Sequence, residues 1–226
     1  MEKITNKEVI DVVKYSEDKL IFAEKRLIGE AGQFKANYYI INFTTGEKEV
    51  VTKKAYMLKK FGFAFEKICN TISDYIQCQT MILSDKSVLV IFPNGQAGLF
   101  DNQGEMLWNK EFSYNGKAVS SLAYDEDAFW CVCREENCVM RYSADNFGVD
   151  IRIGSKDASA FRQPSFASAD DEYVYICSGS NKVRKIDKST LIVSDVEGNF
   201  PNLKKFYKFK EFSIICCSDG LYFDKD

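Results

Sequence analysis

Short apolar runs, each preceded by an acidic or lysine-containing turn, recur along the chain. The turns centre on Asp18, Lys86, Asp127, Glu172 and Glu211, and each leads into four or five mainly apolar residues. Successive turns are separated by 68, 41, 45 and 39 residues. A recurrence near forty residues, built of strand-length pieces, is typical of repeat proteins whose unit is a small β-sheet.

A second series of turns keeps the same spacing. Its anchors are Phe43, Asp101, Ser143, Asp187 and Asp224, at intervals of 58, 42, 44 and 37 residues. Asp, Asn and Gly are frequent in these turns and tolerate the positive φ that tight turns need. Further strand-length runs lie before the first turn and after the second turn of each unit. The pattern therefore predicts four short strands per unit.

The chain holds five such units, and the last one is incomplete. It has strands near 203–208, 213–217 and 221–223. Residues 2–9 are otherwise unassigned, and pairing them with the C-terminal strands would complete a fifth sheet and close a ring without open edges. We therefore predict one all-β domain over residues 1–226, a five-bladed β-propeller of four-stranded antiparallel blades.

The first interval is longer than the others and carries a different pattern. Apolar residues step by three and four over Leu58, Phe61, Phe65, Ile68, Ile72 and Ile76. This spacing predicts an amphipathic helix over 57–73, in an insert of about 55–75. Gly62 weakens such a helix by about 1 kcal/mol. The helix would pack over a blade edge or the mouth of the ring. Alternatives are a lid, a partner-docking helix or an extra half-blade.

The strand–turn units, above all LFDNQGEMLW (99–108) and KIDKSTLIV (185–193), resemble those of the broad β-propeller superfamily with NHL-like, YVTN-like or quinoprotein-like repeats. The resemblance covers most of the chain. The Gly-His and Trp-Asp signatures of WD40 blades are missing, and the sequence has no His. The resemblance implies architecture, and function must be argued from individual sites.

Composition sets limits on partners and location. A net charge of −3 gives no basic surplus for binding phosphate backbones. Charges interrupt the N-terminal segment, and no run is long and apolar enough for a signal peptide or a membrane span. We expect a cytoplasmic monomer that binds neither nucleic acid nor membrane.

The eight cysteines replace small apolar residues of the repeat, which favours buried free thiols. Cys131, Cys133 and Cys138 form a close group, whereas the adjacent Cys216 and Cys217 must face opposite ways in a strand. Alternation places Cys131 and Cys133 on one strand face, and Cys133 and Cys138 flank a four-residue hairpin loop. They could serve a thiolate metal site, but the spacing is not that of a zinc ribbon and a fourth ligand is undefined. We therefore expect no metal and no cofactor.

Catalytic motifs are missing from the sequence. Without His there is no Ser-His-Asp or Cys-His nucleophile system, and no phosphate-binding glycine motif occurs. Acidic residues are numerous, but they recur at equivalent turns, which favours a structural role over the paired carboxylates of a glycosidase. We predict no catalytic residues and a protein that is not an enzyme; a carboxylate-dependent glycoside-acting enzyme remains an alternative.

One end of the predicted ring collects long, varied loops. There the loops between second and third strands meet the links between blades, and loops on a rigid scaffold commonly carry function. Arg and aromatic residues dominate binding hot spots. The candidates for binding a protein partner or small ligand are Arg26, Phe61, Tyr114, Arg134, Arg162 and Asn181. We predict a non-catalytic interaction or ligand-binding propeller. A sugar-binding lectin is an alternative, although its sites should repeat and these loops differ from blade to blade.

Overall fold

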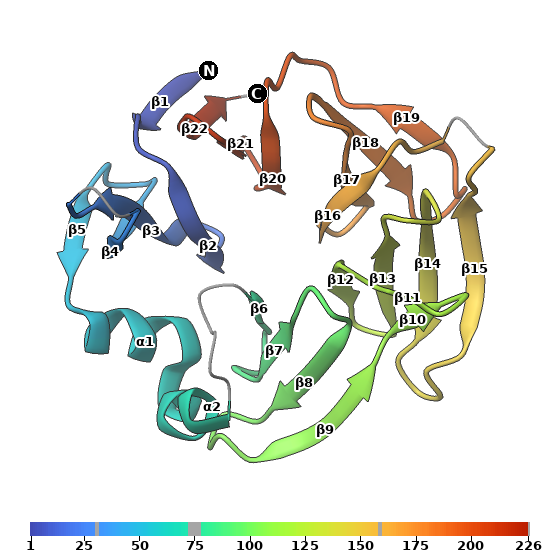
Figure 1. The fold of residues 1–226 in the computed structure, drawn as a ribbon, viewed down its shortest axis with the longest axis horizontal. Helices are drawn as coiled ribbons and strands as arrows, with labels where there is room; N and C mark the ends of the chain where they lie inside the picture. Colours follow the sequence, from blue (N-terminus) through green and yellow to red (C-terminus); the bar gives the residue numbers. More distant parts are fainter. Residues whose placement is uncertain (30–31, 72–77, 158–159, 226) are drawn as a thin grey trace. The chain divides into compact units, whose positions relative to one another are not determined.

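The computed structural model describes residues 1–29, 32–71, 78–157 and 160–225, and these form five four-stranded antiparallel sheets (Figure 1). The five sheets are the blades that the sequence spacing predicts. The all-β, five-bladed propeller class is thereby confirmed.

Each blade is a meander of short strands. The first contains β2 (Val9–Ser16), β3 (Lys19–Leu27), β4 (Phe34–Asn42) and β5 (Lys48–Val51). The second contains β6 (Gln79–Ile82), β7 (Val88–Ile91), β8 (Gln96–Phe100) and β9 (Met106–Glu111). The third contains β12 (Ser121–Asp125), β13 (Ala128–Cys133), β14 (Cys138–Ser143) and β15 (Val149–Gly154). The fourth contains β16 (Pro164–Ala169), β17 (Tyr173–Ser178), β18 (Lys182–Asp187) and β19 (Val193–Asp195). A separate hairpin pairs β10 (Ser113–Tyr114) with β11 (Lys117–Ala118).

The fifth sheet joins the two ends of the described chain. It contains β20 (Leu203–Lys208), β21 (Phe212–Cys217), β22 (Gly220–Lys225) and, beside β22, the N-terminal strand β1 (Glu2–Thr5). β1 runs antiparallel to β22, with Lys3 opposite Tyr222. The predicted completion of this sheet by the N-terminus is confirmed.

The chain divides into two compact units. The N-terminal unit comprises residues 7–92 and 96–110, with the first two sheets and the helical insert. The C-terminal unit comprises residues 1–6, 93–95 and 111–226, with the other three sheets and the β10–β11 hairpin.

The repeated turns are built by polar side chains that accept backbone hydrogen bonds. Asp101 Oδ1 accepts the N–H groups of Gln103 and Glu105 at 2.9 and 2.8 Å. Asp187 Oδ1 accepts those of Ser189 and Thr190 at 2.9 and 2.8 Å. These bonds satisfy turn amides that no ladder reaches, which is why the same residue types recur at this position.

The insert consists of α1 (Lys53–Phe61), a 3-10 turn (Gly62–Ala64) and α2 (Phe65–Thr71). The sequence predicts a helix here but places its start at 57, four residues late. Thr52 caps α1, and its hydroxyl accepts the N–H of Ala55 at 3.1 Å. Gly62, with φ of 59°, ends α1. The predicted residues Ile72 and Ile76 lie outside the described residues.

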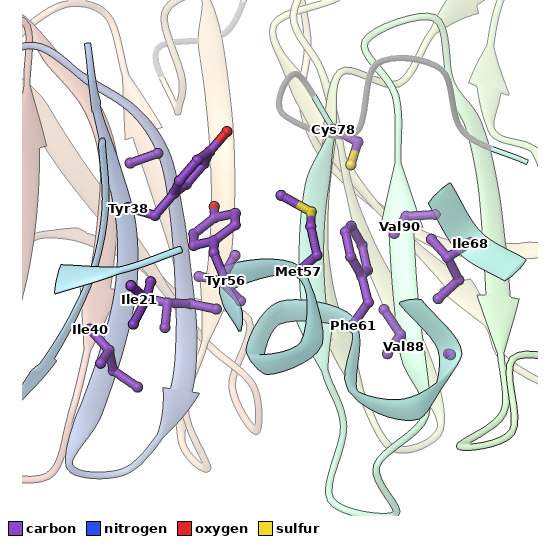
Figure 2. Close-up of a cluster of buried hydrophobic side chains, with 14 of the residues drawn as sticks. Ile21, Tyr38, Ile40, Tyr56, Met57, Phe61, Ile68, Cys78, Val88 and Val90 are labelled. Carbon is purple, nitrogen blue, oxygen red and sulfur yellow. The ribbon is translucent and has the colours of Figure 1, made fainter. Parts of the chain in front are cut away.

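The buried face of the insert also differs from the predicted stripe. Leu58 is 40% exposed, whereas Tyr56, Met57, Lys60 and Phe61 are buried. In the core of the N-terminal unit, Tyr56, Met57 and Phe61 pack with residues of the first two sheets, including Tyr38 and Val88 (Figure 2). The insert is therefore an integral part of this core. In the described part of the chain, no helix is long and apolar enough to cross a membrane.

Candidate functional site

A groove with a volume of about 330 Å³ lies on the C-terminal unit. Four segments contribute to it: the β13–β14 loop, the segment leading into β16, the β17–β18 loop and the start of β20. Antiparallel meanders bring these segments to the same end of their sheets, which is the end that sequence analysis selects for binding. The groove is lined by Arg134, Gln163, Ser165, Gly179, Ser180, Leu203 and Lys204.

Two hydrogen bonds hold the middle of the groove in place. The N–H of Arg162 donates to Ser178 Oγ at 2.8 Å, and the carbonyl of Arg162 accepts the N–H of Gly179 at 2.5 Å. The link before β16 is thereby fastened to the β17–β18 loop, so Gln163 and Gly179 are fixed side by side.

Two further bonds fasten the flanks. The N–H of Gln163 donates to Asn137 Oδ1 at 2.8 Å, which joins the link to the β13–β14 loop. The N–H of Leu203 donates to the carbonyl of Ser180 at 2.8 Å, which joins β20 to the β17–β18 loop. A groove built on such cross-links is largely preformed, and preformed sites lose less conformational entropy on binding.

The electrostatics of the groove are dominated by cations. Arg134 and Lys204 are exposed, and Arg134 makes no ion pair within the described ranges. The acidic neighbours of Arg134 are engaged elsewhere, since Glu135 pairs with Lys117 at 2.8 Å and Glu136 with Lys156 at 2.9 Å. The Lys156 hydrogen bond lowers the pKa of Glu136. Arg134 therefore remains available to an external anion.

Three of the six predicted binding residues lie at or beside this groove. Arg134 lines it, while Arg162 and Asn181 are exposed and adjoin the lining residues Gln163 and Ser180. The segment before β16, which carries Arg162, and the β17–β18 loop, which carries Asn181, therefore lie together. This agrees with the prediction that such loops and inter-blade links share one end of the sheets.

The other three predicted residues are placed differently. Tyr114 belongs to the β10–β11 hairpin, where its hydroxyl accepts a hydrogen bond from Arg152 at 3.0 Å. Arg26 is an exposed residue of β3 in the N-terminal unit, opposite Lys35. Phe61 is 1% exposed and packs in the core of that unit. Its position is that of a packing residue, which corrects its choice as an exposed binding side chain.

Sequence reasoning missed most of the lining residues. Gln163 and Ser180 are direct neighbours of predicted positions, so the loop assignment nearly reaches them. Ser165, Leu203 and Lys204 lie at the beginnings of strands, outside the loops that the repeat pattern marks as variable. The position of Lys204, one residue into a strand that starts from an inter-blade link, is the signal that could have identified it.

The acidic residues of the recurring turns have structural partners. Asp85 Oδ1 accepts the N–H of Ser87 at 2.8 Å, and Asp170 Oδ1 accepts that of Tyr173 at 2.8 Å. The hydrogen bonds from Ser87 lower the pKa of Asp85. Over the described ranges, no group of three or more Cys, Asp or Glu residues is arranged to hold a metal ion.

A second cavity of about 230 Å³ also lies in the C-terminal unit. Its charges oppose one another, with Lys185 and Lys208 facing Glu197 and Asp224 around an aromatic floor. Asp224 is already bound by the N-terminal ammonium group at 2.8 Å. This cavity therefore has less uncompensated charge than the groove.

Comparisons with known proteins bear on the fold. No known protein family matches the sequence, and no curated protein matches it. Among solved structures, the chain is similar to a protein of unknown function from Bacteroides caccae, with a TM-score of 0.53 and 11% identity over 94% of this chain and 71% of that chain.

Two weaker similarities have TM-scores below 0.5. One is to a catalytically inactive virginiamycin B lyase from Staphylococcus aureus, with a TM-score of 0.45 and 12% identity over 99% of this chain and 72% of that chain. The other is to Sqt1 of Saccharomyces cerevisiae, with a TM-score of 0.47 and 9% identity over 92% and 69%. At such identities a structural likeness concerns the fold alone. None of these comparisons favours one repeat type over another.

Proposed function

We propose that this chain is a non-catalytic binding propeller that holds an anionic group of a partner or ligand in the groove of its C-terminal unit. The observation that carries the proposal is the convergence of Arg134 and Lys204 with polar lining groups in one preformed groove. An Arg guanidinium offers a planar fork of donors that matches a carboxylate or phosphate.

The polar groups of the groove add directional contacts. Ser165, Ser180 and the Gln163 amide can all donate to anion oxygens, and Gly179 leaves the floor open to close approach. Hydrogen bonds to a charged group contribute about 1.5–3 kcal/mol each. Losing both cationic contacts is therefore expected to weaken binding by tenfold or more.

The experiment compares wild type with the double variant R134A/K204A on two probes, a library of Glu- and Asp-rich peptides and inorganic phosphate. The matched control is Lys210→Ala, which removes an exposed lysine from the β20–β21 turn, at the other end of the fifth sheet. We expect wild type and the control to retain the same anions, and the double variant to lose them. Retention should fall with added salt, because salt screens exposed charges.

Two results would count against the proposal. Equal affinity of the double variant and wild type for the probes would show that the groove is not the binding site. Failure of wild type to retain either anionic probe would show that the groove holds no anionic group, and retention of glycans on an array by both proteins would then favour the lectin alternative.

A further inference from the structure

Four sulfur atoms share one face of the third blade. In the β13–β14 ladder, Cys133 lies opposite Cys138, and Cys131 lies opposite Met140. Residues at i and i+2, and those directly opposite them, point to the same side of a sheet. The Cys138 thiol lies 3.9 Å from the Met140 sulfur. Three thiols and one thioether are therefore close to one another on this face.

The geometry selects one pair of these thiols. Directly opposite residues in an antiparallel ladder have Cα atoms about 4.5 or 5.5 Å apart. Both values lie within the range of about 4.4–6.8 Å that a disulfide spans. Diagonal neighbours, such as Cys131 and Cys138, are about 7–8 Å apart, which is too far. Only the Cys133–Cys138 rung has the dimensions of a disulfide without backbone movement.

The two thiols already interact. The neighbouring Cys138 thiol lowers the pKa of Cys133. The same contact raises the pKa of Cys138. Since the thiolate is the nucleophile, Cys133 has the character of an attacking thiol and Cys138 that of its resolving partner. By contrast, burial raises the pKa of Cys131 well above its usual value.

The position of the rung gives a route of access. Both thiols are buried, but they form the last rung before the four-residue loop that begins with the exposed residues Arg134 and Glu135. Local opening beside a loop costs less free energy than global unfolding. A small oxidant can therefore reach this pair more readily than the thiols in the middle of strands.

We propose that Cys133 and Cys138 form a reversible disulfide that closes the β13–β14 loop. The oxidant is a low-molecular-weight disulfide such as oxidised glutathione. The Cys133 thiolate attacks one of its sulfurs, the S–S bond breaks, and one glutathione thiolate leaves. Cys138 then loses its proton to solvent and attacks the Cys133 sulfur of the mixed disulfide, releasing the second glutathione. Two thiols are oxidised and one disulfide is reduced to two thiols.

Formation of this bond does not depend on the proposed binding function. The loop that it closes carries Arg134, however, so oxidation would constrain one wall of the groove. A redox change in the thiol pool would thereby act on the candidate site without any change at the other loops.

The test uses the reduced, folded full chain in glutathione redox buffers, followed by alkylation and mass spectrometry of peptides. We expect an oxidised product linking Cys133 to Cys138, lighter by two hydrogens, while the other six cysteines remain alkylated. Reduced glutathione should reverse it. Cys138→Ala should accumulate glutathione on Cys133, and Cys131→Ala should leave the crosslink unchanged.

Either of two results would overturn the proposal. One is full alkylation of both thiols after oxidation of the native protein, with the crosslink forming only in denaturant. The other is a native crosslink that uses Cys131 in place of Cys133. Both readouts are made on the wild-type chain, so neither depends on whether a variant folds.

Discussion

Lys60 is the residue whose environment departs most from what its type suggests. It is fully buried in α1, and its ammonium lies 2.8 Å from Oδ2 of Asp11, which is 1% exposed. The Tyr56 hydroxyl donates to the same carboxylate oxygen, while Oδ1 has no hydrogen-bond partner among the described residues. Burial raises the pKa of Tyr56 well above its usual value, and the charge of Asp11 and the hydrogen bond to it act in the same direction. This trio fixes the insert to the first blade of the N-terminal unit.

Lys60→Met should lower the free energy of unfolding by about 3–5 kcal/mol, because it leaves the Asp11 carboxylate buried and unpaired. The double variant D11L/K60M should recover much of that loss, since it removes both charges. Lys59→Met is the matched control: Lys59 is partly exposed and pairs with Glu49, so the cost should stay below about 1 kcal/mol. Urea unfolding followed by circular dichroism measures all three, and equal costs for Lys59 and Lys60 would contradict this account.

Asp187 provides a prediction of pH dependence. The hydrogen bond from the Ser189 hydroxyl, with those from the turn amides, lowers its pKa from 3.8 to about 2. A depressed pKa means that the stabilisation is complete above pH 4 and disappears as pH falls towards 2. The urea midpoints of wild type and Asp187→Ala should therefore differ by a constant amount from pH 7 to 5 and converge below pH 4.

The control for Asp187 lies in the equivalent turn of the third blade. Asp145→Ala removes an exposed carboxylate that accepts no hydrogen bond in the described part of the chain. Its urea midpoint should stay parallel to that of wild type over the same pH range. A pH-independent difference for Asp187→Ala would show that the turn does not depend on its ionised form.

Sequence pattern predicts the turn residues well and Lys60 poorly. Asp101 and Asp187 act locally, on amides within four residues, so their spacing in the sequence is enough to identify them. Lys60 depends on Asp11, 49 residues earlier, and a pattern that places every charge in solvent cannot find such a pair.

At the scale of elements, the turn between the third and fourth strands places its positive φ at one repeated position. In the first two blades Gly46 and Gly104 occupy it, with φ of 73° and 79°. In the third and fourth blades Phe147 and Leu191 adopt φ of 58° and 61°. The backbone conformation is therefore a property of the repeat, and the glycines relieve its strain in only two copies.

Gly104→Ala should be more destabilising than Gly46→Ala, although the two share the same backbone conformation. An added Cβ at Gly104 would lie 3.0 Å from the Cα of Ala64 in the insert, whereas Gly46 has open space. The strain alone costs about 1–2 kcal/mol, and displacement of the insert adds to it at Gly104. Thermal unfolding measures the difference, and equal melting temperatures would show that the turn and the insert are not in firm contact.

In the insert, the sequence pattern locates the helix but not its ends. Period-3.6 spacing identifies a helix, but the start at Lys53 follows from the Thr52 cap and the end of α1 from the φ of Gly62. Capping depends on one hydroxyl and one dihedral angle, which contribute little to a periodic pattern. Boundaries are therefore lost even where the existence of the helix is predicted.

At the scale of the whole molecule, the fifth sheet unites segments from opposite ends of the described chain. Gly220, with φ of 150°, opens β22 and lies directly against β1. A Cβ at this position would lie 2.1 Å from the carbonyl oxygen of Thr5. Gly220→Ala should therefore separate β1 from its partner strand.

We expect Gly220→Ala to lower the free energy of unfolding by about 2–3 kcal/mol and to increase hydrogen exchange in β1 and β22. Gly116→Ala is the control in the same unit: its φ is also positive, at 71°, but it has open space around it, so only backbone strain is added. Unchanged exchange in β22 of the Gly220 variant would contradict a firm β1–β22 pairing.

The five sheets could be predicted from sequence because each repeat is local, with turns that recur about every forty residues. The groove could be predicted only to the level of the loops. Its lining residues extend from Arg134 to Lys204 in four separate segments, and the bonds that join them are contributed by single residues such as Ser178 and Asn137. Neither the alternation of apolar and polar residues nor the spacing of the turns predicts such hydrogen bonds between blades.

The pairing of β1 with β22 has a consequence for how the protein is made. The contact between Lys3 and Asp219 spans 216 residues. At about 5–20 residues per second, a ribosome needs roughly 10–40 s to synthesise that interval. Throughout that time β1 has no partner strand, although the sheets between can already have formed. Because an unpaired strand edge can pair with other chains, β1 stays open to such mispairing until β22 has left the exit tunnel.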